Sequence, residues 1–524
     1  MKRFSAVLAA LVILSPSVLA EQVSAADAGV TLQSLRVKLE RWNVEGVWPE
    51  VQEALAKQPR DADLLEVGSH LAFLRGDYQE SLRMIKRSME AGGEDEKRKG
   101  FALFIDQTIN VLAPYRRYET PHFIIWLDEK RDGILVDYLT SGLENTYQAM
   151  AQQYGFRPKE KVRVELFPDA KAFYLASTLS VRDIEVTGAV GLTKFNKLQF
   201  LSPRALVHGY RWLDAISHEY MHYLIVKMTS NNAPIWFHEG LAKHEETRWR
   251  NGPTYLSSFY QTLLARALAE KRLIKFEDME PSLIHLETPE EVQLAYAQAA
   301  SAIEFIVATA GGEGLKRIMD RMAQTETKGA GQAVTEVLGM EFSEFQRRWE
   351  GYLTAKQLTP VAGVTMHRFK VKEGKATEEQ MDLEEIKSLV ARNRAHLGDR
   401  LQERGRAGAA VLEYRRALEE LRDSVPIMNR LSSALIGMGR EGEALEVLKR
   451  LVALAPDHPT PYARLGQVYL TLKDFRGAKQ AFEECIQINP FNPEVHVGLA
   501  QAYATLGDTV GAAKERDIAN RLSR

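Results

Sequence analysis

The pentapeptide His218-Glu219-Tyr220-Met221-His222 holds side chains that could bind a metal ion and activate a water molecule. Residues four apart lie on one face of a helix, so His218 and His222 can direct their imidazoles at one cation while Glu219 reaches the water beside it. Neutral imidazole nitrogens suit zinc, and a catalytic zinc has three protein ligands and one position left for water. The motif therefore predicts two ligands and a general base, and it requires a third ligand from elsewhere in the chain.

A helix must carry this motif. Apolar residues recur at helical spacing around it, namely Leu213, Ile216, Met221, Leu224 and Ile225. No Pro or Gly interrupts the run from about Tyr210 to Met228, so we expect a helix there. The same spacing also arises by chance, and two structural histidines on a partly buried helix are the alternative interpretation.

Glu239 is the candidate for the third ligand. A polar break at residues 229–232 follows the first helix, and Pro234 is placed to open a second one. Glu239 comes 17 residues after His222, which allows one loop and an antiparallel return, and Gly240 beside it permits close helix packing. His238 and His244 could compete as ligands, but adjacent helix residues face about 100° apart, so His238 and Glu239 are not expected to share one metal ion.

With these motifs in place, residues from about Tyr118 to Tyr352 resemble the peptidase MA-like domain, a gluzincin-type zinc metallopeptidase. The segment Trp236-x-x-Glu239-Gly240-Leu241-Ala242 matches the second motif of that family. The resemblance implies an α+β lobe with a mixed sheet and zinc-binding helices. It also implies one zinc ion per chain on His218, His222 and Glu239, and Glu219 as the general base for peptide-bond hydrolysis.

A tetrahedral intermediate in such a reaction needs a hydrogen-bond donor for its oxyanion. Residues 294–298 open an apolar helix that runs towards a stop at Gly311-Gly312, and they resemble the segment of related aminopeptidases that carries a tyrosine donor. Tyr296 is therefore the first candidate, with a core tyrosine as the alternative. Tyr255 and Tyr260 are the next candidates, and His208 and His285 are possible on chemistry alone.

Upstream of the motif helix, the sequence alternates as strands do. We expect strands at residues 120–128, 162–167, about 185–192 and 198–202, and a helix at 132–154 that ends at Gly155. An edge strand beside the metal helix commonly binds substrate backbone in this class of peptidase. Residues 198–201 or 188–192 are the candidate edges, and a plain sheet edge is the alternative for either one.

The first residues predict export. Lys2-Arg3, the apolar run Ala6 to Leu14 and Val18-Leu19-Ala20 form the three parts of a secretory signal peptide, cleaved after Ala20 or, alternatively, Ala25. We therefore expect a periplasmic protein. No other stretch is expected to approach about 18 apolar residues, so no membrane span is predicted in the mature chain.

Composition bounds the remaining possibilities. The 524 residues suffice for about three domains, and a net charge of -2 argues against nucleic acid as a partner. The short basic runs Lys97-Arg98-Lys99 and Arg347-Arg348 lie beside acidic residues, which predicts solvated faces. Cys485 is the only cysteine, so the chain has no internal disulfide, and this thiol is expected to be buried.

The last quarter of the chain repeats every 34 residues. Three sets of positions share this period: Ala410, Ala444, Ala478 and Ala512; Pro456 and Pro490; and Leu397, Leu431, Leu465 and Leu499. The pattern resembles about four tetratricopeptide repeats over residues 391–524, a solenoid whose concave surface binds peptides or partner proteins. A weaker match to the repeat lies near the N-terminus, at Gly68, Leu71, residues 76–78, Ser81 and Ile85. It predicts a helical, repeat-like region from Gln33 to about Leu112.

Together these signals predict a signal peptide (1–20), an N-terminal helical region (21–115), a metallopeptidase domain (116–356), a linker with a short strand at 364–371 (357–390) and the repeats (391–524). Two functions follow. The first is an exported zinc metallopeptidase whose repeats recruit a peptide substrate or a partner protein. The second is a repeat scaffold of an envelope complex that carries a catalytically silent lobe; the intact Glu219 favours the enzyme.

Overall fold

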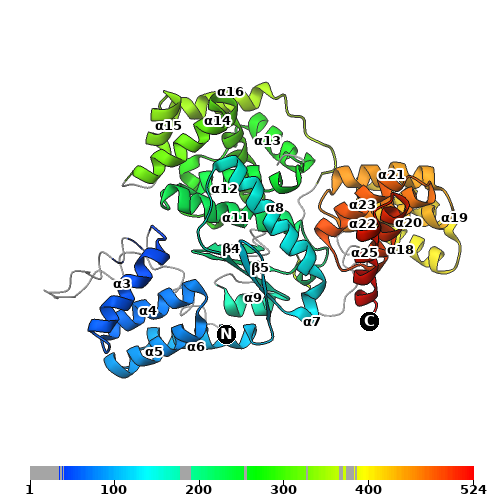
Figure 1. The fold of residues 1–524 in the computed structure, drawn as a ribbon. Helices are drawn as coiled ribbons and strands as arrows, with labels where there is room; N and C mark the ends of the chain where they lie inside the picture. The colour runs from blue at the N-terminus through cyan, green and yellow to red at the C-terminus, as the bar shows by residue number, and fades with distance from the viewer. Residues whose placement is uncertain are drawn as a thin grey trace.

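The computed structural model describes residues 41–177, 190–252, 256–325, 329–364, 370–372 and 386–524, together with Leu35, Lys38 and Leu383. The predicted signal peptide, Tyr255 and half of the predicted linker lie outside these residues. Figure 1 shows a central lobe with a sheet, a group of helices from the N-terminal part on one side and the C-terminal helices on the other.

Four helices precede the sheet: α3 (Val44–Lys57), α4 (Ala62–Arg75), α5 (Tyr78–Gly92) and α6 (Glu96–Leu112). The helical prediction for this region is confirmed over the described residues. The basic run at 97–99 is not simply a solvated face, because Arg98 is only 11% exposed and pairs with Glu66 at 3.0 Å and with Asp63 at 3.1 Å. These bonds join α6 to α4.

The sheet has five strands in the order β1-β2-β3-β5-β4. They are β1 (Arg116–Glu119), β2 (Phe123–Leu127), β3 (Val162–Phe167), β4 (Gly191–Lys194) and β5 (Lys197–Leu201). β2, β3 and β5 are parallel, whereas β1 and β4 pair antiparallel at the two edges. The expected mixed sheet is therefore confirmed, although the separate strand β1 was not predicted.

The prediction that residues 198–201 form an edge is wrong, because β5 lies between β3 and β4. All five residues of β5 are buried, as expected of a strand covered on both faces, whereas three of the four residues of β4 are only partly buried. β4 is the edge strand, and it overlaps the other candidate segment at residues 191 and 192. Residues 188 and 189 of that segment, and residues 185–187 of the strand expected there, lie outside the described part of the chain.

Helices cover both faces of the sheet (Figure 1). One face packs against α11 (Trp212–Thr229), which also contacts α8 (Val136–Tyr154). The other face packs against α9 (Ala170–Ala176), which contacts α6. α8 ends at Gly155, whose φ of 67° places it in the left-handed region that favours glycine, as the sequence predicted.

Beyond the sheet, the lobe is helical. Its helices are α12 (Ile235–Glu245), α13 (Ser258–Glu270), α14 (Pro289–Gln324), α15 (Gly331–Leu338) and α16 (Phe342–Ala355). The expected stop at residue 311 is a kink, because Gly311 has φ 70° and ψ 176° inside α14 and a helix continues beyond it. α14 is also long and apolar enough to cross a membrane, contrary to the expectation from sequence; however, 61% of its most apolar window is buried, as in a core helix.

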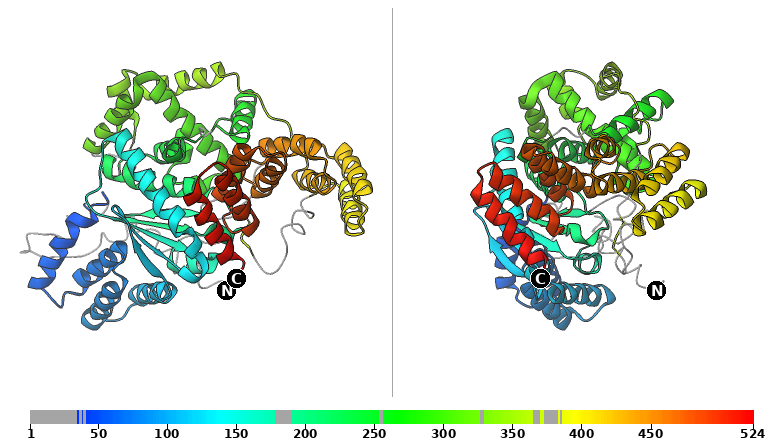
Figure 2. Two further views of the ribbon diagram at one scale, coloured as in Figure 1. Left: turned by 45° about the vertical axis from the view of Figure 1, so that its right-hand side comes forward. Right: turned by 90° about the vertical axis from the view of Figure 1, so that its right-hand side faces the viewer.

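The C-terminal part forms four antiparallel helix pairs. They are α18 (Leu389–Glu403) with α19 (Ala407–Glu420), α20 (Val425–Gly437) with α21 (Glu441–Leu454), α22 (Pro459–Thr471) with α23 (Phe475–Ile488), and α24 (Pro493–Thr505) with α25 (Thr509–Leu522). Figure 2 shows these pairs stacked into a curved array. The four alanines with the 34-residue period are all buried, as close helix crossing requires.

Two smaller predictions concern the repeats and the linker. Cys485 is buried, as expected. Val371 pairs with Leu206 in an isolated antiparallel bridge, whereas residues 365–369 of the predicted linker strand lie outside the described residues.

Candidate metal centre

Two neighbouring helices carry the candidate ligands. The predicted motif helix is confirmed as α11, which carries His218 and His222 in its middle turns. Ser230 and Asn231 have φ of 50° and 61° and turn the chain, and Pro234 is the N-terminal cap of α12, which carries Glu239. Gly240 allows the close approach of α14, because a Cβ there would lie 2.5 Å from the carbonyl oxygen of Ala299.

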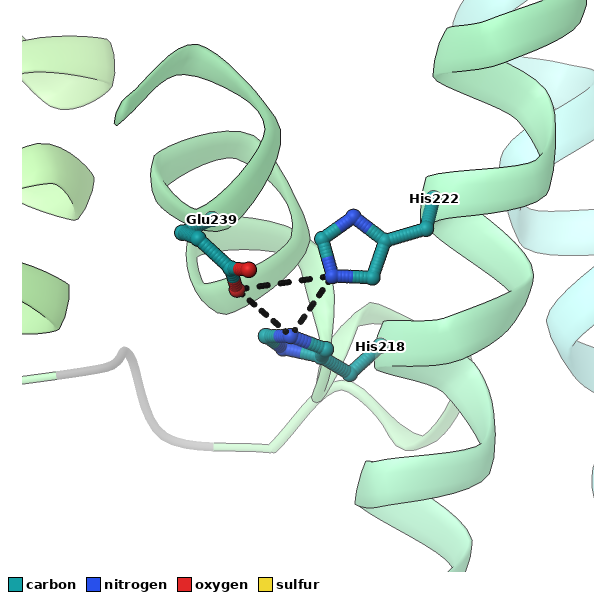
Figure 3. A group of neighbouring side chains, drawn as sticks. All are labelled: His218, His222 and Glu239. Atoms are coloured by element: carbon teal, nitrogen blue, oxygen red, sulfur yellow. Dashed lines mark hydrogen bonds and ion pairs between the residues drawn. The ribbon is translucent and has the colours of Figure 1, made fainter. Parts of the chain in front are cut away.

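The three candidate ligand side chains point at one another across the gap between α11 and α12 (Figure 3). Nε2 of His218 lies 3.1 Å from Nε2 of His222, and each of these nitrogens lies 3.4 Å from Oε2 of Glu239. Ligands about 2.0–2.1 Å from a tetrahedral zinc ion lie about 3.3–3.4 Å from one another. The triangle of donor atoms therefore has the dimensions of one face of a zinc tetrahedron.

The electrostatics of this triangle suit a cation. Oε2 of Glu239 is buried, and among the described residues no donor makes a hydrogen bond to it. Burial disfavours the charged form of Glu239, yet His222 and His218 hold the pKa of its carboxyl well below the usual range. Burial also opposes charge on His218, but Glu239 and Glu246 outweigh it and raise the pKa of His218 to about 9. Two imidazoles and one carboxylate are the donor types that zinc accepts, so these residues fit the ion.

Behind His218 lies a second carboxylate that sequence reasoning missed. Oε2 of Glu246 is 3.5 Å from Nδ1 of His218, and Oε1 of Glu246 accepts a hydrogen bond from Lys243 at 2.6 Å. A carboxylate on the far nitrogen of a metal-binding histidine orients its ring and sets its tautomer. Glu246 is seven residues after Glu239, so helical spacing could have placed both carboxylates on one side of α12.

Glu219 faces the edge strand of the sheet. The hydroxyl of Thr193 on β4 lies 2.6 Å from Oε2 of Glu219 and 2.7 Å from the backbone oxygen of the same residue. A Cβ at Gly191 would lie 2.8 Å from Cγ of Glu219, so only glycine leaves room there. Neither Thr193 nor Gly191 was singled out from the sequence, because no local spacing connects β4 to α11.

Among the candidate tyrosines, Tyr296 lies at this site. Its ring centroid is 6.4 Å from that of His218. Burial is the main cause that raises the pKa of Tyr296 well above the usual range, and the negative charge of Glu239 adds to it. The hydroxyl of Tyr296 therefore keeps its proton at neutral pH. Tyr260 instead donates to Oε1 of Gln293 at 2.9 Å, and Tyr255 lies outside the described residues.

The other histidines do not join the candidate ligands. Among the described residues, the only group of His, Cys, Asp or Glu side chains spaced to hold a metal ion is His218, His222 and Glu239. The ring of His238 is 5.6 Å from that of His222, and Nδ1 of His244 lies 2.9 Å from Oε1 of Glu245. His208 packs against His458 at 4.3 Å between ring centroids, and His285 is exposed.

Comparison with protein families identifies two parts of the chain. The family model of the Peptidase MA superfamily matches residues 144–355, a span that includes all three candidate ligands, Glu219 and Tyr296. Two tetratricopeptide repeat models match residues 401–468 and 459–492. The chain contains a Peptidase MA superfamily domain followed by tetratricopeptide repeats. The repeats provide a capacity for protein–protein interaction.

Other comparisons give short matches. None of the curated proteins matches this chain. Among solved structures, a MamA protein is 19% identical with a TM-score of 0.25, over 26% of this chain and 73% of MamA. MamA residues 41-end from Desulfovibrio magneticus RS-1 are 22% identical with a TM-score of 0.25, over 26% of this chain and 76% of that one. TTC0263, a thermophilic TPR protein in Thermus thermophilus, is 26% identical with a TM-score of 0.24, over 25% of this chain and 74% of that one.

Proposed function

We propose that this protein is a zinc-dependent peptidase. The observation that supports this most directly is the triangle of His218, His222 and Glu239, whose donor atoms lie 3.1–3.4 Å apart. One corner of the triangle is Oε2 of Glu239, which is buried and has no hydrogen-bond donor among the described residues. A site of this kind without a cation would leave a buried carboxylate oxygen without a donor, which is costly. The intact Glu219 beside it supports catalysis over a purely structural metal site.

The roles of the side chains follow from their places. Bound zinc would supply Lewis-acid activation of the scissile carbonyl and of water. Glu219 would take the proton of the attacking water and pass it to the leaving amine, and Thr193 holds its carboxylate in place. The protonated hydroxyl of Tyr296 would donate to the oxyanion.

The proposal is tested by zinc content and proteolysis of an unfolded protein such as casein. Wild type should carry one zinc per chain and cleave casein, and chelation should abolish cleavage. Glu219→Gln should keep the zinc and lose about 10²–10⁴-fold in turnover. His222→Ala should lose the zinc, whereas His244→Ala should keep it, because His244 pairs with Glu245 and lies outside the ligand group.

A catalytically silent scaffold is the second candidate, supported by the repeats that occupy the last quarter of the chain. It predicts stoichiometric zinc, or none, with no cleavage of any substrate by wild type. Undiminished hydrolysis by Glu219→Gln would also contradict the proposed mechanism.

Export and recruitment are part of the same proposal. The three-part layout of residues 1–20 supports cleavage near Ala20 and a periplasmic location. The mass of the mature N-terminus and fractionation of cells that express the full chain would test this.

The repeats would bind a substrate or a partner protein. Deletion of residues 391–524 is a poor test of that role, because these residues contact the motif helix directly.

A further inference from the structure

Residues of the repeats bind Arg211, the residue directly before the motif helix. The guanidinium of Arg211 bonds to Asp457 at 2.8 Å and to Glu484 at 2.7 Å, and it donates to the backbone oxygen of Pro456 at 2.9 Å. Arg211 is the N-terminal cap residue of α11, which has no side-chain cap of its own. The start of the ligand-bearing helix is therefore held by side chains and backbone more than 240 residues later in the chain.

Hydrogen bonds to the backbone of the repeats also hold the start of α11. The indole nitrogen of Trp212 donates to the carbonyl oxygen of Ile486 at 3.2 Å, and the amide of Tyr210 donates to that of Ile488 at 3.0 Å. Gly209 has a φ of 76°, and a Cβ there would lie 2.3 Å from the oxygen of Ile488. Only glycine permits this approach, so the end of α23 and the start of α11 have little freedom to shift.

One of these carboxylates, Glu484, also reaches the segment that follows the second ligand-bearing helix. Arg250, in the short turn after α12, bonds to Asp214 of α11 at 2.6 Å and to Glu484 at 3.4 Å. Glu484 thus faces one arginine from the start of α11 and one from the segment that follows α12.

The charge of Asp457 also has a long-range electrostatic effect on Lys243 of α12. Burial opposes the charge of Lys243, but Glu246, Tyr260 and, at longer range, Asp457 raise its pKa. Lys243 in turn holds Glu246 at 2.6 Å, and Glu246 faces Nδ1 of the candidate ligand His218. These ion pairs join Lys243 and Glu246, at the end of α12, to the candidate ligand His218 of α11.

The structure assigns Asp457 and Glu484 of the repeat array as positioning residues of the metal centre. Asp457 and Glu484 both hold Arg211 at the start of α11, and Glu484 also pairs with Arg250 in the segment after α12. The triangle of ligand atoms depends on the relative placement of α11 and α12. His218 is six residues after Trp212, which is about 9 Å along the helix, so a tilt at the start of α11 moves its imidazole. This assignment rests on the proposed zinc site, and it makes the repeats part of that site rather than a detachable tether.

Zinc affinity of the full-length protein tests the assignment without requiring activity. The variant Asp457→Asn/Glu484→Gln keeps the size of both side chains and removes their charges. We expect its zinc Kd, measured by competition with a chromophoric chelator, to rise about tenfold, the lower end of the effect of losing outer support of a metal site. Asp457→Asn alone should give a smaller rise and serves if the double variant does not fold.

Glu515→Gln is the matched control, because Glu515 is a repeat carboxylate that also bonds to the lobe, through Tyr138 at 2.7 Å. Among the described residues, Glu515 makes no hydrogen bond or ion pair with α11 or α12. Its zinc Kd should stay within about twofold of wild type even if its melting temperature falls. An unchanged zinc Kd in the folded Asp457/Glu484 variant, or an equal rise in Glu515→Gln, would overturn the assignment. Absence of zinc from wild type would instead refute the proposed function, and with it this role.

Discussion

The hydroxyl of Thr193 lies 2.6 Å from Oε2 of Glu219, so a side chain of the edge strand β4 is bonded to the helix that carries the metal motif. Hydrogen bonds to a charged group contribute about 1.5–3 kcal/mol, enough to select one rotamer of the carboxylate. The edge of the sheet thus helps to set the position of the proposed general base.

Replacing Thr193 tests this contact. Thr193→Val keeps the shape of the side chain but removes the donor, so Glu219 should sample other rotamers. We expect kcat to fall about tenfold with zinc content unchanged. Thr193→Ser, which keeps the hydroxyl, should recover most of the turnover, and equal loss in Ser and Val would show that the hydrogen bond is not what matters.

Gly191 is the second contact between β4 and Glu219. In Gly191→Ala the new Cβ would lie 2.8 Å from Cγ of Glu219 and 3.0 Å from the ring of Phe200, so one of them must move. Turnover should fall at least tenfold while zinc stays bound. Gly351→Ala is the control, since nothing lies within 4 Å of the added Cβ and alanine favours the helix α16.

Tyr296 is expected to act through its hydroxyl. Loss of an oxyanion donor typically costs about 10²–10³-fold in kcat, so Tyr296→Phe should lose about that much with little change in zinc content. Tyr260→Phe should lose far less, because its hydroxyl bonds to Gln293. Steady-state kinetics on one peptide substrate would separate them, and the reverse ranking would exchange the two roles.

Glu246 is expected to act on the metal rather than on the substrate. Glu246→Gln weakens the acceptor that faces Nδ1 of His218, and loss of such support typically reduces metal affinity about 10–100-fold. The neighbouring Glu245→Gln is the control, because Glu245 faces His244 and Arg248. A zinc Kd that changes equally in both variants would remove Glu246 from the site.

The lowered pKa of Glu245 predicts that the stability of the protein depends on pH. Burial opposes its charge, but hydrogen bonds from His244 and Arg248 lower its pKa to about 2 from an ordinary value of 4.5. A carboxyl with a lower pKa in the folded state stabilises the protein above its unfolded pKa and loses this contribution as pH falls through the folded pKa.

Urea denaturation measures this effect. Glu245→Gln should lower the free energy of unfolding by about 1–3 kcal/mol at neutral pH. The difference from wild type should shrink between pH 4.5 and about 2, as Glu245 takes up its proton in the wild type. A difference that is constant with pH would mean that the loss comes from packing.

The candidate ligands could be predicted because their relations are local. His218 and His222 are one helical turn apart on α11. Glu239 lies on the next helix, α12, which follows after one loop, so helix geometry and this loop bring the three residues together. Glu246 obeys the same spacing and could have been found. The 34-residue period likewise reports helix pairs that stack on their nearest neighbours.

The wrong edge strand had a different cause. Residues 198–201 were a possible edge from their alternation alone, but the parallel pairing of β5 with β3 places them inside the sheet. Pairing partners are set by contacts between distant segments, and the period of a strand does not name them.

From the sequence alone we could predict the candidate metal-binding groups, the repeats and the α+β class, because each depends on residue spacings of one helical turn, one strand period or one repeat. Only the tertiary structure decided which groups surround the ligands. Thr193 meets Glu219 across 26 residues and Arg211 meets Glu484 across 273, through packing of whole elements that no local pattern records. The shape of the site therefore depends on the sheet edge and on the repeats as much as on the motif.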